Sequence, residues 1–174
     1  MSIALEVKLT MPITIRAFLP KIGKALQEIL ELSFVPKILA EEYVDRKWVP
    51  LESDVLTKDS RLIGILIEGE PETVSVFAHS RAQDRLINEH GVFAIVEVTG
   101  PRTPLILALT AAVAVALGRE CGTEVADNMP FFSNVFDRSS DDFVKAIQVK
   151  DSFDDYRAAA ESFYGSLPAH STVS

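Results

Sequence analysis

Two of the chain's three histidines lie close together with a serine and an aspartate, in the stretch VFAHSRAQDRLINEHG. His79, Ser80, Asp84 and His90 are the residue types that acyl transfer needs. His79 and Ser80 are adjacent at the end of an expected strand, so that their side chains point apart, and no glycine-flanked nucleophile turn surrounds the serine. The pattern therefore favours a structural role. A small enzyme or ligand-binding domain that uses His79, Asp84 or His90 remains the alternative.

The same stretch has the signals of a short helix between two strands. Ser80 is placed to cap the helix, and Gln83, three residues on, completes a capping box. Gly91 is placed to end the helix in a left-handed conformation. We therefore expect a helix over residues 80–91, with both histidines at the surface.

The remaining residues that metal or nucleotide chemistry would need are scattered. His79 and His90 do not have the spacing of a helical zinc motif, and adjacent carboxylates such as Asp154 and Asp155 do not follow a calcium loop. The single Cys121 can form no internal disulfide, and its place near the end of an apolar helix disfavours a thiolate. The glycines form no phosphate-binding loop. The sequence therefore predicts no cofactor and no metal site, and it gives nucleotide-dependent catalysis no support.

One cluster suits the binding of another protein. The stretch DNMPFFSNVFDRSSDD combines apolar, mainly aromatic side chains with carboxylates, which matches a hot spot for a basic partner. Its candidate partner-binding residues are Asp127, Met129, Phe131, Phe132, Phe136, Asp137, Asp141 and Asp142. The alternative is that the phenylalanines fill the open edge of the core beneath a long loop, and both roles are possible for different phenylalanines.

The charge of the chain narrows the class of partner. The 174 residues carry a formal net charge of −8, and residues 120–161 contribute −6 of it with ten acidic and four basic side chains. Such a field repels nucleic acid and anionic membranes and attracts basic proteins. The N-terminus does not resemble a secretory signal, so we expect a cytoplasmic protein.

The strands that must position these residues follow an alternating or apolar pattern. Residues 3–9 alternate, 38–44 and 47–51 resemble a hairpin with a turn at Asp45 and Arg46, and 62–67 is apolar on both faces, as in a central strand. Gly64 in that strand permits a close approach from above. Because hairpins outnumber strand–helix–strand units, we expect an α+β fold with a mostly antiparallel sheet and helices on one face.

Four helices complete the expected elements. Pro20 suits the first turn of an amphipathic helix that ends near Ser33, and Thr103 with Pro104 starts a helix over about 104–117 that is apolar almost all round. That apolar run is too short for a membrane span and is typical of a buried helix. Ser139 or Ser140 opens a third helix, and Ser152 a fourth that ends near Tyr164. The length favours one domain over residues 1–165, with a flexible tail over 166–174.

In size, charge and architecture the whole chain resembles the small acidic α+β immunity proteins of bacterial toxin systems. The resemblance implies a non-catalytic inhibitor that blocks a basic protein, such as a cognate toxin, through an acidic surface. A homo-oligomer that pairs an edge strand with its twin is compatible with this function and with the enzyme alternative.

Overall fold

The computed structural model describes residues 3–52, 54–57, 61–81, 91–98, 100–127, 131–132 and 137–168. Its strands are β1 (Ala4–Leu9), β2 (Ile13–Thr14), β3 (Ile38–Val44), β4 (Lys47–Pro50), β5 (Val55–Leu56), β6 (Ile63–Ile67), β7 (Thr73–Arg81), β8 (Gly91–Val98), β9 (Glu124–Asp127) and β10 (Asp137–Ser139). Its helices are α1 (Ile15–Ile29), α2 (Pro104–Cys121), α3 (Ser140–Ile147) and α4 (Tyr156–Ser166).

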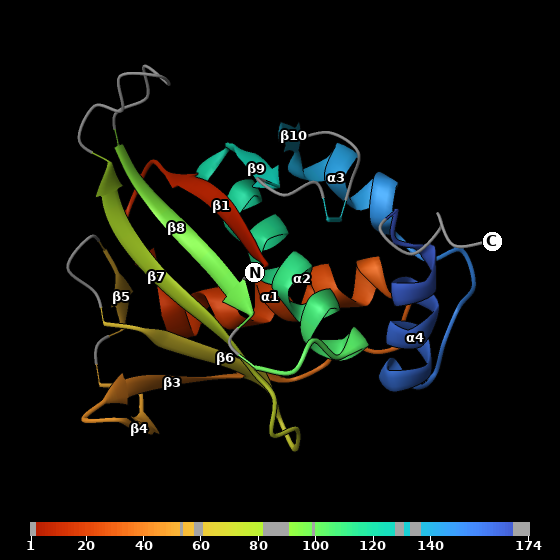
Figure 1. The fold of residues 1–174 in the computed structure, drawn as a ribbon, viewed down its shortest axis with the longest axis horizontal. Helices are drawn as coiled ribbons and strands as arrows, with labels where there is room; N and C mark the ends of the chain where they lie inside the picture. The colour runs from red at the N-terminus through yellow and green to blue at the C-terminus, as the bar shows by residue number, and fades with distance from the viewer. Residues whose placement is uncertain are drawn as a thin grey trace.

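Eight of the strands form one sheet in the order β10-β9-β1-β8-β7-β6-β3-β4, and every pair of neighbours described in it is antiparallel. The short strands β2 and β5 pair separately. The helices gather on one face of the sheet, with α2 in contact with β1, β7, β8 and β9 on one side and with the other three helices on the other (Figure 1). The prediction of an α+β fold with a mostly antiparallel sheet and a buried apolar helix is confirmed.

Helix α2 is the centre of the core. All its residues from Leu105 to Gly118 are buried, and Thr103 caps its start by accepting a hydrogen bond from the Ile106 amide at 3.3 Å. The helix is long and apolar enough to span a membrane by length and composition, but 83% of that window is buried inside the protein, as in a core helix.

The end of α2 lies beyond the predicted position. The helix passes Gly118 and ends at Cys121, where Gly122 adopts a left-handed conformation with φ of 64°. At Gly118 a Cβ would lie 2.3 Å from Ser140 Oγ and 3.0 Å from the Thr123 carbonyl oxygen. Gly118 therefore serves close packing, and Gly122 ends the helix.

Helix α1 begins earlier than predicted. It starts at Ile15, and Pro20 lies inside it on the exposed side. The buried stripe already includes Ile15 and Phe18, so the apolar face starts upstream of the proline and continues to Ile29. This packing stabilises the helix even though Pro20, within it, has no amide hydrogen to donate.

The predicted hairpin and the close approach at Gly64 are both confirmed. β3 and β4 are joined by Asp45 and Arg46, whose φ values of 50° and 66° match a two-residue hairpin turn. A Cβ at Gly64 would lie 2.7 Å from the Trp48 ring, so the glycine makes room for the indole. β4 is an edge strand and includes Pro50, which has no amide hydrogen to offer a further strand.

Two further predicted helix starts are wrong. Ser80 is a residue of β7, paired with Val92 in β8, and so does not cap a helix; Gly91 is the first residue of β8. The helix expected after Ser80 falls on residues 82–90, outside the described residues. Helix α4 is capped by Asp155, and Ser152 lies before it. The start of α3 is confirmed, with Ser139 as its cap.

Candidate functional site

Part of the predicted partner-binding cluster is inside the protein. Phe132 has an exposure of 0%, and its ring centroid lies 6.2 Å from that of Phe143 and 6.4 Å from that of Phe163. Asp127 is 1% exposed and accepts a hydrogen bond from the Phe132 amide at 2.7 Å. Both residues are therefore removed from the partner surface that the sequence suggested. Phe131 is half-buried against Phe132, and Met129 and Phe136 lie outside the described residues.

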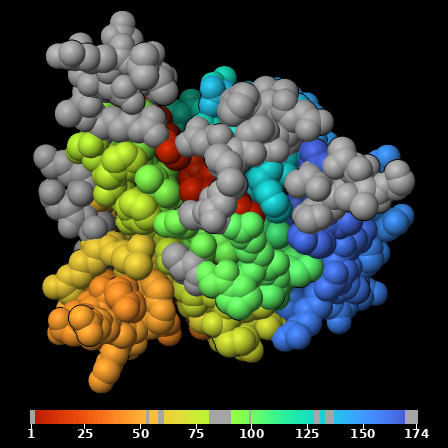
Figure 2. Space-filling model, viewed as in Figure 1, coloured from red at the N-terminus to blue at the C-terminus, as the bar shows by residue number. Residues whose placement is uncertain are grey.

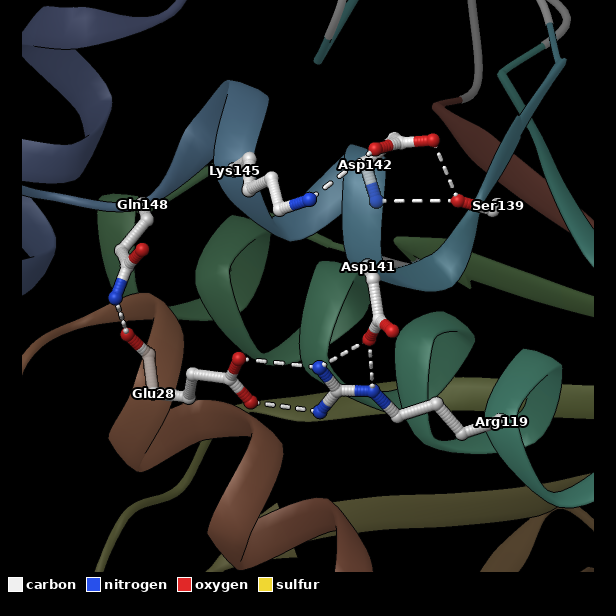
Figure 3. A network of polar contacts seen from close by, with 7 residues as sticks. All are labelled: Glu28, Arg119, Ser139, Asp141, Asp142, Lys145 and Gln148. Atoms are coloured by element: carbon white, nitrogen blue, oxygen red, sulfur yellow. Dashed lines mark hydrogen bonds and ion pairs between the residues drawn. The ribbon is translucent and has the colours of Figure 1, made fainter.

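Asp141, Asp142 and Asp137 are exposed, but the first two have partners (Figure 3). Arg119 at the end of α2 donates to both carboxylate oxygens of Glu28, at 2.6 and 3.0 Å, and to Asp141 at 2.8 Å. These two carboxylates, chiefly through the hydrogen bond that Arg119 donates to Glu28, raise the pKa of Arg119. The network joins α1, α2 and α3. It neutralises the charge of Asp141, which the sequence analysis predicted to bind a partner.

Asp142 is paired within its own helix. It accepts hydrogen bonds from Ser139 Oγ at 2.8 Å and from Lys145 Nζ at 3.5 Å, and these contacts lower its pKa, the Ser139 bond most of all. Its amide donates in turn to Ser139 Oγ at 3.2 Å, as the capping of α3 requires. Asp142 is thus explained by the start of a helix.

A second group of aromatic and acidic residues is brought together where the end of α1 meets the segment between α3 and α4. Phe34 and Val35 are 39% and 47% exposed, although both are large apolar side chains. We call this group the Phe34 corner; its residues are Phe34, Val35, Asp151, Asp154, Asp155 and Tyr156.

The segment before α4 is bonded along the end of α1. The Ser33 amide donates to the Phe153 carbonyl at 3.1 Å, and the Phe153 amide donates to the Glu31 carbonyl at 2.9 Å. The Ser33 hydroxyl donates to Asp154 Oδ1 at 2.6 Å. These bonds fix Asp154 against the residue that precedes Phe34.

The other end of the Phe34 segment is fixed by close packing on α1. A Cβ at Gly23 would lie 2.6 Å from the Pro36 carbonyl oxygen and 3.0 Å from Val35 Cγ1, so only glycine permits this approach without a shift. The carbonyl of Lys37, the residue after Pro36, accepts a hydrogen bond from the Glu68 amide at 2.9 Å. Phe34 and Val35 are therefore exposed on a segment that is held on both sides.

Tyr156 is positioned by a buried carboxylate. Its hydroxyl donates to Glu70 Oε1 at 2.5 Å, and Arg157 donates to Glu70 Oε2 at 2.6 Å. The Glu70 side chain is only 7% exposed, and the hydrogen bonds from Tyr156 and then Arg157 lower its pKa. The same bond raises the pKa of Tyr156. The Tyr156 ring lies 6.4 Å from the Phe34 ring, tilted by 60°.

The carboxylates of the Phe34 corner differ from those near Arg119 in their partners. Asp151, Asp154 and Asp155 are exposed and form no ion pair within the described residues. Asp155 accepts from the amides of Arg157 and Ala158 as the cap of α4. The sequence analysis did not predict this corner. Its only local signals are two adjacent apolar residues before Pro36 and an aspartate pair before Tyr156.

The histidine alternative is described only in part. His79 lies near the C-terminal end of β7 and is half-buried. The centroid of its ring is 6.3 Å from that of the Phe93 ring. Its Nδ1 is buried and has no hydrogen-bond partner among the described residues. Asp84 and His90 lie outside them, so the alternative site stays a prediction. Within the described residues, no three side chains of His, Cys, Asp or Glu are grouped to hold a metal ion.

Comparison with known proteins gives this chain no relative: no family model, no curated protein and no solved structure matches it.

Proposed function

We propose that this protein is a non-catalytic binding protein of the inhibitor or immunity type, which blocks a basic protein partner through the Phe34 corner. The observation that carries the proposal is the corner itself: exposed apolar side chains beside carboxylates that form no ion pair within the described residues, on a segment fixed from both sides.

The distribution of charge supports this direction of approach. The residues of α3 and α4, blue in Figure 2, gather on the side of the molecule opposite the β3–β4 hairpin, which is orange. They belong to the part of the chain that carries most of the negative charge. A field of this kind steers a basic protein toward one side and raises its association rate.

The physics of hot spots supports the location. Interfaces concentrate their binding energy in a few aromatic or arginine anchors with a polar rim, and pre-organised groups lose little entropy when they bind. Phe34 and Tyr156 supply the aromatic surface, and Asp151 and Asp154 supply a rim that a basic partner can pair with.

The test is capture from the producing cell at about 150 mM salt, a concentration at which the Debye length is about 8 Å. Three tagged chains are compared: the wild type, the corner variant Phe34→Ala/Asp151→Lys, and the hairpin variant Tyr43→Ala/Glu52→Lys. Tyr43 has the same 39% exposure as Phe34, and Glu52 is exposed like Asp151, so the hairpin variant is a matched control.

We expect the wild type and the hairpin variant to capture a basic protein whose activity is inhibited at a one-to-one ratio. The corner variant should bind it about thirtyfold more weakly or worse, which is the effect of losing a hot spot of about 2 kcal/mol. Failure to capture a basic protein, or equal capture by the corner variant, would contradict the proposal.

A further inference from the structure

We propose that the Phe34 corner selects arginine: the partner residue that it takes is an arginine whose guanidinium lies on the Phe34 ring and donates to the Asp154 carboxylate. This inference rests on the proposed function and names the chemistry of the partner at the same site.

The first support is the arrangement of ring and carboxylate. The Phe34 side chain is exposed at the surface. The Tyr156 ring lies beside it, with the ring centroids 6.4 Å apart and the ring planes tilted by 60°. Asp154 is bonded through Oδ1 to the hydroxyl of Ser33, the residue before Phe34. Its carboxylate is therefore held in one orientation beside the Phe34 segment, and Oδ2 has acceptor capacity to spare.

The second support is that Tyr156 and the backbone of the Phe34 segment are held in place by their neighbours. Tyr156 is fixed by its hydroxyl, which donates to Glu70, and the Phe34 segment is fixed by the close approach of Pro36 to Gly23. A planar cation can then stack on an aromatic ring that loses little conformational entropy on binding.

The corner favours arginine over the other occupants of an apolar and acidic surface. A guanidinium is planar and weakly hydrated, stacks on aromatic rings and donates in a fork to carboxylates, whereas the lysine ammonium is compact and strongly hydrated. A purely apolar segment would desolvate Asp151, Asp154 and Asp155 without supplying a cation to pair with them. A second copy of this chain, with its net charge of −8, would be repelled.

The experiment is a titration of the isotopically labelled protein, followed by amide shifts of residues 33–35 and 151–156. Two synthetic peptides of equal length and charge are used, with arginine or lysine at the same positions in a glycine–serine background. Each is titrated into the wild type and into Phe34→Leu, which keeps apolar area but removes the ring. Asp154→Asn keeps an oxygen for Ser33 but loses the charge, and Tyr43→Leu is the control for an equally exposed aromatic side chain elsewhere.

We expect the arginine peptide to bind the wild type about two- to fivefold more tightly than the lysine peptide, as an exposed cation–π contact provides. Phe34→Leu should abolish this preference while the lysine peptide's affinity hardly changes, Asp154→Asn should weaken binding of the arginine peptide, and Tyr43→Leu should change neither affinity.

Two results would overturn the inference and separate it from the proposed function. Equal binding of both peptides at the corner, reduced equally by Phe34→Leu, would refute selection of arginine but leave a basic partner in place. Shifts confined to other parts of the surface would refute the corner as the site, and with it both proposals.

Discussion

Replacing Phe132 by alanine tests whether this residue belongs to the core, as the structure has it, or to a partner surface. Its side chain is completely buried among Phe131, Phe143 and Phe163. A buried aromatic side chain removes about 150–250 Å² from water, which at about 25 cal/mol per Å² corresponds to about 4–6 kcal/mol as an upper estimate. Measured truncations of buried phenylalanine cost about 3–5 kcal/mol. We expect Phe132→Ala to lower the free energy of unfolding by about 3–5 kcal/mol.

The assay is urea unfolding followed by far-UV circular dichroism and by the fluorescence of Trp48. Trp48 is the only tryptophan and lies on β4, at the far edge of the sheet from β9 and β10, so it reports global unfolding. Phe131→Ala is the control, because Phe131 is in the same loop but half-buried and should cost less. If Phe132→Ala does not fold, Phe132→Leu should still show a loss of about 1–2 kcal/mol. A loss below about 1 kcal/mol for Phe132→Ala, or a larger loss for Phe131→Ala, would refute the core assignment.

Three further predictions concern Glu42, Glu70 and Gly23. Glu42 is buried with one oxygen 3.7 Å from Arg61 and the other without a described hydrogen-bond partner, so Glu42→Leu should raise the free energy of unfolding by about 1 kcal/mol or more in urea, and a clear decrease would count against this reading. Because the folded-state pKa of Glu70 is lowered, its ionised form stabilises the protein above the unfolded pKa, near 4.5, and this contribution disappears as the pH falls through the folded pKa; the stability gap between wild type and Glu70→Gln should therefore shrink between pH 7 and pH 3, and a constant gap would contradict this. Gly23→Ala should destabilise the protein by about 1–3 kcal/mol in thermal unfolding, whereas Gly165→Ala in α4, with no atom within 4 Å of the new Cβ, should be neutral or stabilising by up to about 1 kcal/mol; the reverse order would refute the packing argument.

The elements that the sequence predicted well are those whose signals are local. Thr103 and Pro104 start α2, and Ser139 starts α3, because a capping hydroxyl acts within three residues of itself. The two-residue turn at Asp45 and Arg46 is likewise set by its immediate neighbours. The uninterrupted apolar character of α2 predicted its central burial without any knowledge of its neighbours.

The elements that the sequence predicted wrongly depend on contacts between distant residues. Ser80 has the local signal of a cap, but pairing of β7 with β8 extends the strand through it. Pro20 has the local signal of a helix start, but burial of Ile15 and Phe18 extends α1 upstream. Gly118 has the local signal of a helix end, but its role is to admit Ser140. In each case tertiary packing outweighs a preference of about 1 kcal/mol.

The candidate site shows the same limit of local reasoning. The Phe34 corner joins residues 33–35 to residues 151–156, and its central bond, from Ser33 to Asp154, spans 121 positions. Residues 33–35 contain no carboxylate, and residues 151–156 contain carboxylates and aromatic rings but not the exposed Phe34 and Val35. Only the pairing of the α3–α4 segment with the end of α1 produces it.

The location of the uncompensated charge also follows from the fold and not from the count of acidic residues. The sequence placed the partner surface in the stretch from Asp127 to Asp142, where carboxylates are dense. Arg119, however, lies outside the acidic stretch in sequence and pairs with Asp141 in space, and Lys145 pairs with Asp142. Asp151 and Asp154 form no such ion pair within the described residues, so their charge stays available to a basic partner beside exposed Phe34. Charge and apolar surface coincide at this corner, and that coincidence makes it the better candidate for recognition.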